Sequence, residues 1–358
     1  MKKHWGFAVI LAALAFLFSV APLRADTPVL IIGAIYVGSV NDFGYNRSFH
    51  DAFTQVCKDI PGVKLLEAEN VPESAEAERV MEGMIQQGAK LIFPTSFGYQ
   101  DSARRVAKRH KEVCFEFAGD GATAKNFGVF FGSTQAAWFP MGVAAGRMTR
   151  SGKLGFVIGM PIGYALGNVN AFQLGARSVN PKATTVVVVT GGWSDKAKEA
   201  GAANALLDQG CDVVAMHVDS PATIIQTVEA RGGMSIGFQS TEARALAPKG
   251  WLTGLGFTWT PFFTKVAKSV IANQFRGEAV YQGLGQMVAM APFGASVPAG
   301  VQSQVKAAAA EVATGYNPFT GPLKSNTGAM VLPPNASVGA DQMGSMNWYV
   351  EGVVGKVR

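Results

Sequence analysis

Short apolar runs alternate with segments of helical period along most of the chain. Residues 29–36 have the composition of a strand buried on both faces, and 49–60 follow with the period of an amphipathic helix. Further strands are expected at 63–66, 90–93, 113–118 and 129–131, and further helices at 74–87, 99–111 and 135–149. A repeated strand–helix unit is typical of a doubly wound parallel sheet.

The same pattern starts again after Ser151-Gly152-Lys153, which we interpret as the crossing between two lobes. Strands are expected at 154–158, 184–190, 213–217, 234–238 and 251–257, with helices at 165–179, 195–209, 222–230 and 261–274. The tail, 318–358, is rich in Gly, Pro and Asn and is expected to pack along the second lobe. The sequence therefore predicts an α/β protein of two doubly wound lobes joined by a hinge, with a cleft at the carboxyl ends of both sets of strands.

The first residues have the features of an export signal. Lys2 and Lys3 precede an apolar stretch over 5–21, and the small Ala25 suits a cleavage position. We expect residues 1–25 to be a cleaved signal peptide and the mature chain to be periplasmic. An uncleaved membrane anchor is the alternative, but the apolar run is shorter than the roughly 20 residues that a span needs.

Composition excludes several other classes of protein. With 48% hydrophobic and 16% charged residues, the chain is too apolar for disorder. The formal charge is +6, but removal of Lys2, Lys3 and Arg24 leaves 28 basic against 25 acidic residues. This balance does not favour nucleic-acid binding.

Cysteine and histidine give no sign of a metal site or a cofactor. The chain has three cysteines, which we interpret as small apolar side chains in the core, although a Cys57–Cys114 pair stays open. The histidines after the leader show no metal-ligand spacing, and no nucleotide-binding glycine motif follows the first strand. We expect neither a metal nor a cofactor.

Aromatic, amide, hydroxyl and carboxylate side chains follow the predicted strands, without a cluster of Lys or Arg. The candidate ligand-binding residues are Asp42, Phe43, Tyr45, Asn46, Ser96, Phe97, Asp120, Met160, Trp193, Asp219, Gln239 and Trp259. Rings can stack on a planar heterocycle for roughly 1–3 kcal/mol each, and carboxylates accept hydrogen bonds from ring N–H and amine groups. We therefore expect an uncharged or weakly cationic, nitrogen-rich ligand. The alternative is that the aromatic side chains only fill the lobe cores.

Signals for catalysis are weak. Residues 233–237 match G-x-S-x-G, but Ser235 lies inside a predicted strand rather than at a strand-to-helix turn. Asp42 and Asp120 are conceivable as an acid–base pair, yet nothing in their spacing brings them together. We expect a binding protein and not an enzyme. An exported nucleoside or amide hydrolase and a sensory subunit remain the alternatives.

Several segments together resemble the basic-membrane-protein family of solute-binding proteins of ABC importers. They lie at 42–46 (DFGYN), 142–146 (GVAAG), 155–157, 170–176 (NAFQLGA), 193–195 and 219–222, with tail segments at 317–322 and 346–350. This family includes purine nucleoside receptors, and the tail is similar to a non-lipidated branch associated with purine bases such as adenine.

The resemblance implies a type I periplasmic binding fold. The N-terminal lobe would comprise 26–150 plus 259–316, and the C-terminal lobe 151–258 plus 317–358. It also implies a small-molecule ligand, an inner-membrane ABC permease as partner, no nucleic acid, and a monomer.

The resemblance also assigns roles within the site. It implies that Tyr45 stacks on a base with Asn46 and Asp42 nearby, and that Asp120 accepts hydrogen bonds from the base. Nucleoside-binding relatives hold ribose with an Asp and a Lys, at positions where this chain has 239–241 (QST) and 257–259 (FTW). A base without sugar, capped by Trp259, is the ligand that this difference favours, and a nucleoside is the alternative.

Overall fold

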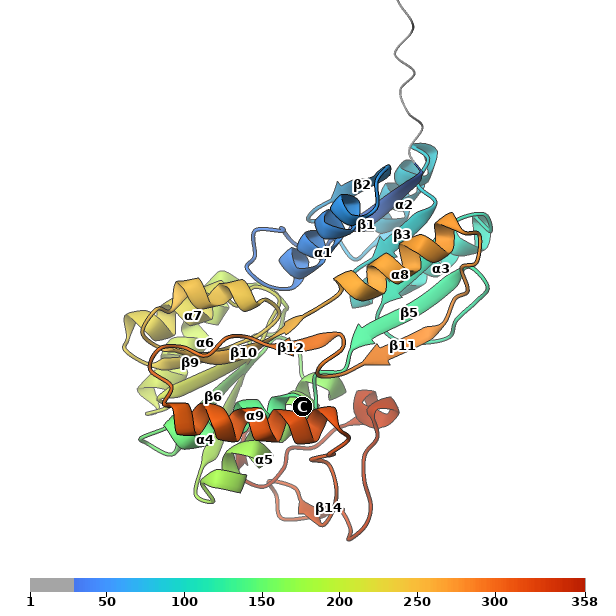
Figure 1. Ribbon diagram of the computed structural model, residues 1–358. Helices are drawn as coiled ribbons and strands as arrows, with labels where there is room; N and C mark the ends of the chain where they lie inside the picture. Colours follow the sequence, from blue (N-terminus) through green and yellow to red (C-terminus); the bar gives the residue numbers. More distant parts are fainter. Residues whose placement is uncertain (1–28, 358) are drawn as a thin grey trace, which may run out of the picture.

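The computed structural model describes residues 29–357 and arranges them in two lobes, each built on one sheet (Figure 1). The predicted signal peptide, 1–25, lies outside the described residues. In the part of the chain that is described, no helix combines the length and the apolar character needed to cross a membrane.

The N lobe has a six-stranded sheet in the order β11-β5-β4-β3-β1-β2, and its pairings are all parallel. Its strands are β1 (Leu30–Ile35), β2 (Val63–Ala68), β3 (Leu91–Pro94), β4 (Cys114–Ala118), β5 (Phe127–Gly132) and β11 (Ala279–Gln282). Its helices are α1 (Tyr45–Asp59), α2 (Ala75–Gln86), η1 (Phe97–Tyr99), α3 (Gln100–Arg109) and α8 (Thr260–Ile271).

The C lobe has a seven-stranded sheet in the order β12-β10-β9-β8-β6-β7-β15, parallel except for β12. Its strands are β6 (Lys153–Ile158), β7 (Thr184–Val189), β8 (Val213–His217), β9 (Met234–Gly237), β10 (Trp251–Phe257), β12 (Val288–Met290) and β15 (Val353–Val354). Its helices are α4 (Trp138–Met148), α5 (Gly163–Val179), α6 (Lys196–Asp208), α7 (Ala222–Ala230), η2 (Thr241–Leu246), α9 (Ala299–Ala313) and η3 (Ala340–Ser345). The tail adds a small hairpin of β13 (Leu323–Lys324) and β14 (Met330–Leu332).

The chain passes between the lobes three times: from β5 to α4, from β10 to α8 and from β11 to β12. Figure 1 shows these connections running side by side between the two sheets. The expected crossing at Ser151-Gly152-Lys153 is wrong, because Gly152 forms the turn between α4 and β6 within one lobe, with a φ of 72°. The glycine signalled a tight turn rather than a hinge.

The predicted lobe boundaries need a matching correction. Helix α4 belongs to the C lobe, where Gly142 lies so close to α5 that a Cβ there would overlap the Phe172 carbonyl oxygen. Helix α9 packs against α4, and β12 pairs with β10. Residues from 138 to 150 and from 288 to 316 therefore lie with the second sheet, because α4 packs against α5 and β10, α9 packs against α4, and β12 pairs with β10.

The cysteines are unpaired in the structure. Only Cys211 is buried, whereas Cys57 and Cys114 are partly exposed. The expectation of three buried thiols therefore holds for one of them, and the Cys57–Cys114 bond that the sequence left open is not formed.

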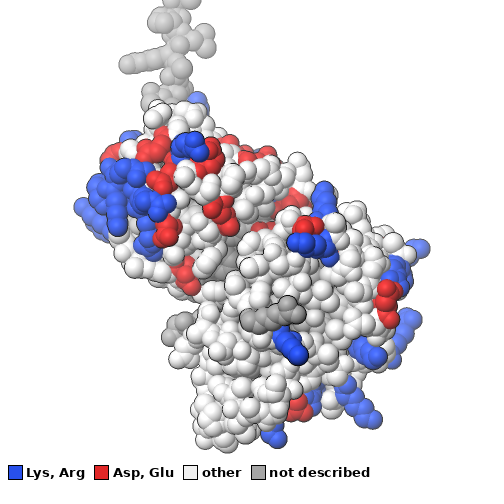
Figure 2. Space-filling model, turned by 180° about the vertical axis from the view of Figure 1, so that it is seen from behind, with Lys and Arg blue, Asp and Glu red and all other residues white. Residues whose placement is uncertain are grey.

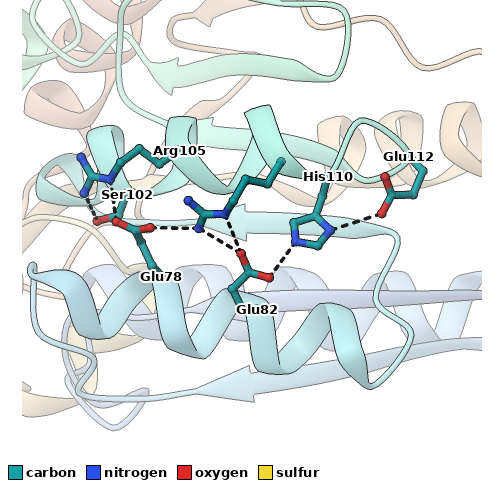
Figure 3. Close-up of polar contacts among 7 residues, drawn as sticks. Glu78, Glu82, Ser102, Arg105, His110 and Glu112 are labelled. Atoms are coloured by element: carbon teal, nitrogen blue, oxygen red, sulfur yellow. Dashed lines mark hydrogen bonds and ion pairs between the residues drawn. The ribbon is translucent and has the colours of Figure 1, made fainter.

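On the face seen in Figure 2, charged side chains cluster on the N lobe, while the middle of the C lobe is largely uncharged and its charged side chains lie toward the edge. Between α2 and α3, Arg109 contacts both Glu78 and Glu82 at 2.9 Å, and Arg105 contacts Glu78 at 2.6 Å (Figure 3). Exposed pairs of this kind stabilise a fold by only about 0–1 kcal/mol each. The cluster joins two neighbouring surface helices and lies apart from the cleft residues.

Candidate ligand-binding cleft

A cavity of about 810 Å³ lies between the two lobes, and no lysine or arginine of residues 29–357 lines it. This volume falls within the roughly 300–1,000 Å³ usual for small-molecule sites. The N lobe contributes Tyr45, Ser96, Phe97, Ala118, Gly119, Asp120, Gly121, Phe131, Gly132, Ala279 and Tyr281. The crossing after β5 and the C lobe contribute Ser133, Gln135, Ile162, Tyr164, Trp193, His217, Asp219 and Gln239.

The structure brings seven of the twelve predicted site residues to this cavity and places five elsewhere. The seven are Tyr45, Ser96, Phe97, Asp120, Trp193, Asp219 and Gln239. The five that do not line it are Asp42, Phe43, Asn46, Met160 and Trp259.

Asp42 holds the loop before α1 instead of facing the cavity. Its carboxylate accepts hydrogen bonds from the backbone N–H groups of Gly44, Asn46 and Arg47 at 2.8, 2.9 and 3.1 Å. The side-chain amide of Asn46 donates to the same carboxylate at 2.8 Å. Burial raises the pKa of Asp42, although these bonds act in the opposite direction. The sequence interpretation missed this role because α1 begins at Tyr45, four residues earlier than predicted, so Asp42 can cap its first turn.

Trp259 lies in the N-lobe core and is 1% exposed. Its ring stacks on Phe257 at 4.3 Å and on Phe49 at 5.0 Å between centroids, and its indole N–H donates to Ser48 Oγ at 3.1 Å. The predicted capping role for Trp259 therefore does not fit this structure. Trp259 follows β10 of the C lobe but directly precedes α8 of the N lobe, and its ring joins the aromatic cluster of the N lobe instead of facing the cleft.

Tyr45 supplies an aromatic surface on the N-lobe side. Its hydroxyl donates to the Thr95 carbonyl at 2.6 Å, and its ring lies edge-on to Phe49 at 4.9 Å. Phe131, at the end of β5, lies 6.4 Å from the Tyr45 ring and also lines the cavity. Because Tyr45 is anchored at both its ring and its hydroxyl, its surface is fixed before a ligand binds.

The C-lobe side carries Trp193, His217 and Asp219. The rings of Trp193 and His217 are 5.8 Å apart and tilted by 33°. Asp219 is 7% exposed, and no hydrogen bond to its side chain is formed by the described residues. Burial raises the pKa of Asp219 well above its usual range, and the nearby Asp42, Glu73 and Glu199 raise it further. A carboxyl group in this position is available to a ligand: its carbonyl oxygen accepts a hydrogen bond and, while the group is protonated, its O–H donates one.

Gln239 offers a second unpartnered acceptor. Its Nε2 donates to the Val218 carbonyl at 3.3 Å, whereas its buried Oε1 has no partner. Its φ is 76°, in the left-handed region that a residue with a long side chain seldom adopts. Backbone conformations of this kind concentrate at ligand sites, and a donor on the ligand would satisfy the free oxygen.

Direct contacts join the two lobes around the cavity, so the structure is a closed arrangement. The Tyr45 N–H donates to the Asp219 carbonyl at 2.9 Å. On the other side, the Tyr164 hydroxyl donates to Asp120 Oδ2 at 2.9 Å. Gly44 fits because a Cβ there would overlap the Asp219 carbonyl oxygen.

The twelve predicted binding residues do not include several residues that line the cavity, among them Phe131, Tyr164, His217 and Tyr281. His217 ends β8, so the rule that sites follow strands could have found it. Tyr164, in the first turn of α5, is close enough to β6 to be found in the same way. Tyr281 lies on β11, which the hydrophobic pattern did not indicate.

Known proteins with similar sequences identify the family. A family described as PnrA-like ABC transporter substrate-binding proteins matches residues 29–303. The chain belongs to this family. The resemblance stated from the sequence is thus confirmed, and the chain is a solute-binding protein of the ABC transporter type. The family consists of substrate-binding proteins of ABC transporters.

Two relatives carry named ligands. A purine-binding protein of Brucella abortus is 34% identical over 331 residues, which cover 92% of this chain and 94% of that protein. A Haloferax volcanii protein named as an ABC transporter glucose-binding protein is 31% identical over 274 residues, covering 76% of this chain and 69% of that protein.

Solved structures confirm the fold. An ABC transporter solute-binding protein from Conexibacter woesei superposes with a TM-score of 0.68 at 23% identity, covering 80% of this chain and 97% of that one. One from Aeropyrum pernix gives 0.69 at 17% identity, covering 83% and 93%. The predicted type I arrangement of two α/β lobes is therefore correct.

Proposed function

We propose that this solute-binding protein captures a purine base, adenine or a related nitrogen heterocycle, in the cleft between its lobes. The observation that carries the proposal is the lining of the cavity, which combines aromatic rings with unpaired acceptors and lacks cations. Tyr45 and Trp193 come from opposite lobes, so closure would bring an aromatic surface to each side of a planar ligand. The purine-binding relative supports the same ligand class.

The acceptors match the edge of a purine base. Asp219, Gln239 and Asp120 each present oxygen to the cavity, and an adenine edge offers amine and ring N–H donors. A hydrogen bond from such a donor to a neutral carboxyl or amide oxygen contributes about 0.5–1.5 kcal/mol, and one to an ionised carboxylate about 1.5–3 kcal/mol. Phosphate-bearing ligands do not fit, because the lining residues provide no guanidinium or ammonium group.

A nucleoside is the second candidate, favoured by the size of the cavity. A volume of about 810 Å³ leaves space for a sugar beside the base. However, the family resemblance implies that nucleoside-binding relatives hold ribose with an Asp and a Lys where this chain has 239–241 (QST) and 257–259 (FTW), and Trp259 lies in the N-lobe core. The lining therefore lacks the charged pair that would hold ribose.

The experiment is a binding screen on ligand-free protein. The protein is unfolded in denaturant, dialysed, refolded and tested by calorimetry and thermal shift with adenine, hypoxanthine, guanine, adenosine and glucose. A ligand at 100 times its Kd should add about 2.7 kcal/mol of stability. We expect adenine to give the largest shift and glucose none. Tighter binding of adenosine would establish the nucleoside alternative, and no shift with any nitrogen heterocycle would reject the proposal.

A Trp193 variant tests the stacking. Trp193→Ala should weaken binding of the base by about tenfold, since stacking on one ring contributes roughly 1–3 kcal/mol. Trp348→Ala is the matched control, because Trp348 is also half-buried in the C lobe but does not line the cavity. Equal affinities of both variants and the unaltered protein would contradict stacking on Trp193.

Export and delivery complete the proposal. We infer that residues 1–25 direct the chain to the periplasm and that the closed, loaded protein passes its ligand to an ABC permease, with the protein acting as a monomer. Family membership supports this role. Sequencing the amino terminus of the mature protein tests the cleavage, with Asp26 expected as the first residue.

A further inference from the structure

Three side chains form a hydrogen-bonded row that ends in the cleft. The Thr134 hydroxyl donates to Asn168 Oδ1 at 3.0 Å, and Asn168 Nδ2 lies 2.9 Å from His217 Nδ1. Thr134 belongs to the crossing after β5, Asn168 to α5 and His217 to the end of β8. Thr134 is 2% exposed and Asn168 is completely buried, so water cannot readily replace either bond. His217 itself lines the cavity.

The row determines which nitrogen of His217 carries the proton. Because the Thr134 hydroxyl donates to the amide oxygen of Asn168, the amide NH₂ is the group that faces His217. Nδ1 must then accept, and the proton of the neutral ring lies on Nε2. Burial lowers the pKa of His217 to about 4, so the ring is neutral at pH 7.

Packing also fixes the orientation of the ring. His217 lies edge-on to Phe238 at 4.9 Å between centroids, and Trp193 lies on it at 5.8 Å. With Nδ1 held by Asn168, the free ring nitrogen is Nε2, and its N–H is a donor without a partner among the described residues. His217 is partly exposed and lines the cavity, so this free N–H favours a ligand that offers it an acceptor.

We propose that His217 is a specificity-determining residue that donates from Nε2 to an unprotonated ring nitrogen of the ligand, with Asn168 and Thr134 as its positioning residues. This inference rests on the proposed function and narrows it. Asp219 follows His217 by two residues and presents an acceptor to the same cavity, as does Gln239. The cleft therefore suits a ligand that carries both a ring nitrogen acceptor for His217 and N–H donors for Asp219 and Gln239. The edge of an aminopurine carries these groups side by side.

Binding measurements test the donor. His217→Phe keeps a planar ring and removes the N–H, so the affinity for adenine should fall about 5- to 30-fold, the equivalent of 1–2 kcal/mol. The 1-, 3- and 7-deaza analogues of adenine each replace one ring nitrogen by C–H. We expect one of them to bind the unaltered protein and His217→Phe equally, because it lacks the atom that His217 contacts. If His217→Phe binds adenine as tightly as the unaltered protein does, the inference is overturned while purine binding stands.

Nitrogen-15 NMR of the histidine ring tests the positioning role without any ligand. At pH 7 we expect the Nε2–H form of His217 in the unaltered protein. Asn168→Asp replaces the donor by an acceptor, so it should move the proton to Nδ1 and reduce adenine affinity as much as His217→Phe does. Thr134→Val should give a mixture of both forms. Thr253→Val is the matched control, because its buried hydroxyl donates to the Ala291 carbonyl at 2.9 Å and does not reach His217.

The outcomes separate this inference from the proposed function. A charged His217 ring at pH 7, or an Nδ1–H form, would overturn the inference even if adenine binds tightly. Failure of every nitrogen heterocycle to bind the unaltered protein would reject the proposed function and the inference together. Adenine binding by the unaltered protein is retained only when the inference about His217 fails by itself.

Discussion

Asp42 and Asp219 both follow strands of the sheets, yet the folded chain surrounds them in opposite ways. Asp42 accepts four hydrogen bonds from its own loop and the start of α1. Asp219 lines the cavity, and its side chain has no hydrogen-bond partner among residues 29–357. A carboxylate with its acceptor positions filled maintains the structure, and an unfilled one is available to a ligand.

Asp219→Asn should stabilise the ligand-free protein and weaken ligand binding. Burial raises the pKa of Asp219, so the folded state retains a proton that the unfolded state releases. The protonated Asp219 contributes fully to the free energy of unfolding below about pH 3.8, which is the ordinary pKa of aspartate. This contribution is lost as the pH rises, because the unfolded state then releases the proton more readily than the folded state does. The melting temperature of Asp219→Asn should therefore exceed that of the unaltered protein by an amount that grows as the pH rises from 4. At neutral pH the difference in the free energy of unfolding should be about 1–3 kcal/mol.

Asp208→Asn is the control for this pair of measurements, because Asp208 is exposed on α6 of the same lobe, does not line the cavity, and forms only an exposed ion pair with Arg231, which contributes about 0–1 kcal/mol. It should leave both the pH profile and the affinity for adenine unchanged. A Tm difference for Asp219→Asn that is the same at pH 4 and pH 8 would contradict the account of Asp219 as a buried acid.

Single site residues could be predicted from the sequence where a side chain suited to ligand binding also follows directly after a strand. Trp193, Asp219 and Gln239 were found in this way and do line the cleft. Trp259 satisfies the same rule but stacks inside the N lobe, and Phe131, which the rule omitted, lines the cleft instead. The side of a strand end that faces the cleft depends on the twist of the sheet and on packing between elements, which a single sequence does not encode locally.

At the scale of elements, the turn before α1 brings the lobes into contact. Gly44 lies against the backbone of Asp219 from the C lobe, and the next residue, Tyr45, donates its N–H to the Asp219 carbonyl at 2.9 Å. The Cδ of Pro221 lies next to the same position. The absence of a side chain at Gly44 therefore allows two backbones to meet across the cleft.

Gly44→Ala should hinder closure. The added Cβ would overlap the Asp219 carbonyl oxygen, and backbone cannot yield as a flexible side chain can, so the lobes must separate slightly. We expect the affinity for adenine to fall at least tenfold, with an unchanged melting temperature for the ligand-free protein, which can open. Calorimetry and thermal unfolding measure the two quantities.

Gly201→Ala provides the comparison, because a Cβ at Gly201 in α6 meets nothing within 4 Å. It should keep full affinity and gain up to about 1 kcal/mol of stability from helix propensity. Tight adenine binding by Gly44→Ala would show that the close contact at Gly44 is not needed for the bound state.

The regular elements of both sheets were largely predictable because hydrophobic period determines them. The expected strand over 213–217 and helix over 222–230 coincide with β8 and α7. Helix α9 was not predicted, since its alanine-rich sequence lacks a clear apolar face. Strands β11 and β12 are short, and their pairing with β5 and β10 stabilises them through contacts distant in sequence.

On the scale of the whole molecule, three crossings connect two lobes that are otherwise joined by few polar contacts. Tyr45 and Asp219 meet on one side of the cavity, and Tyr164 and Asp120 on another. Arg47 and Glu242 lie 3.8 Å apart across the lobes but are partly exposed, so their attraction is weak. A ligand that contacts both lobes needs to contribute only a few kcal/mol to the free-energy difference between the open and closed states to favour the closed one.

Tyr164→Phe should shift this balance toward the open form. The variant loses the hydroxyl that donates to Asp120 at 2.9 Å between the lobes, a bond worth about 1 kcal/mol. The apparent affinity for adenine should fall about fivefold, because a smaller fraction of the protein is closed. Small-angle scattering should give an unchanged radius of gyration at saturating adenine.

A double-mutant cycle with Asp120→Ala identifies the bond: in that background Tyr164→Phe should have no further effect, whereas an additive loss would show that Tyr164 acts on the ligand independently of Asp120. Tyr316→Phe, exposed and outside the cavity, serves as the control and should match the unaltered protein in both measurements.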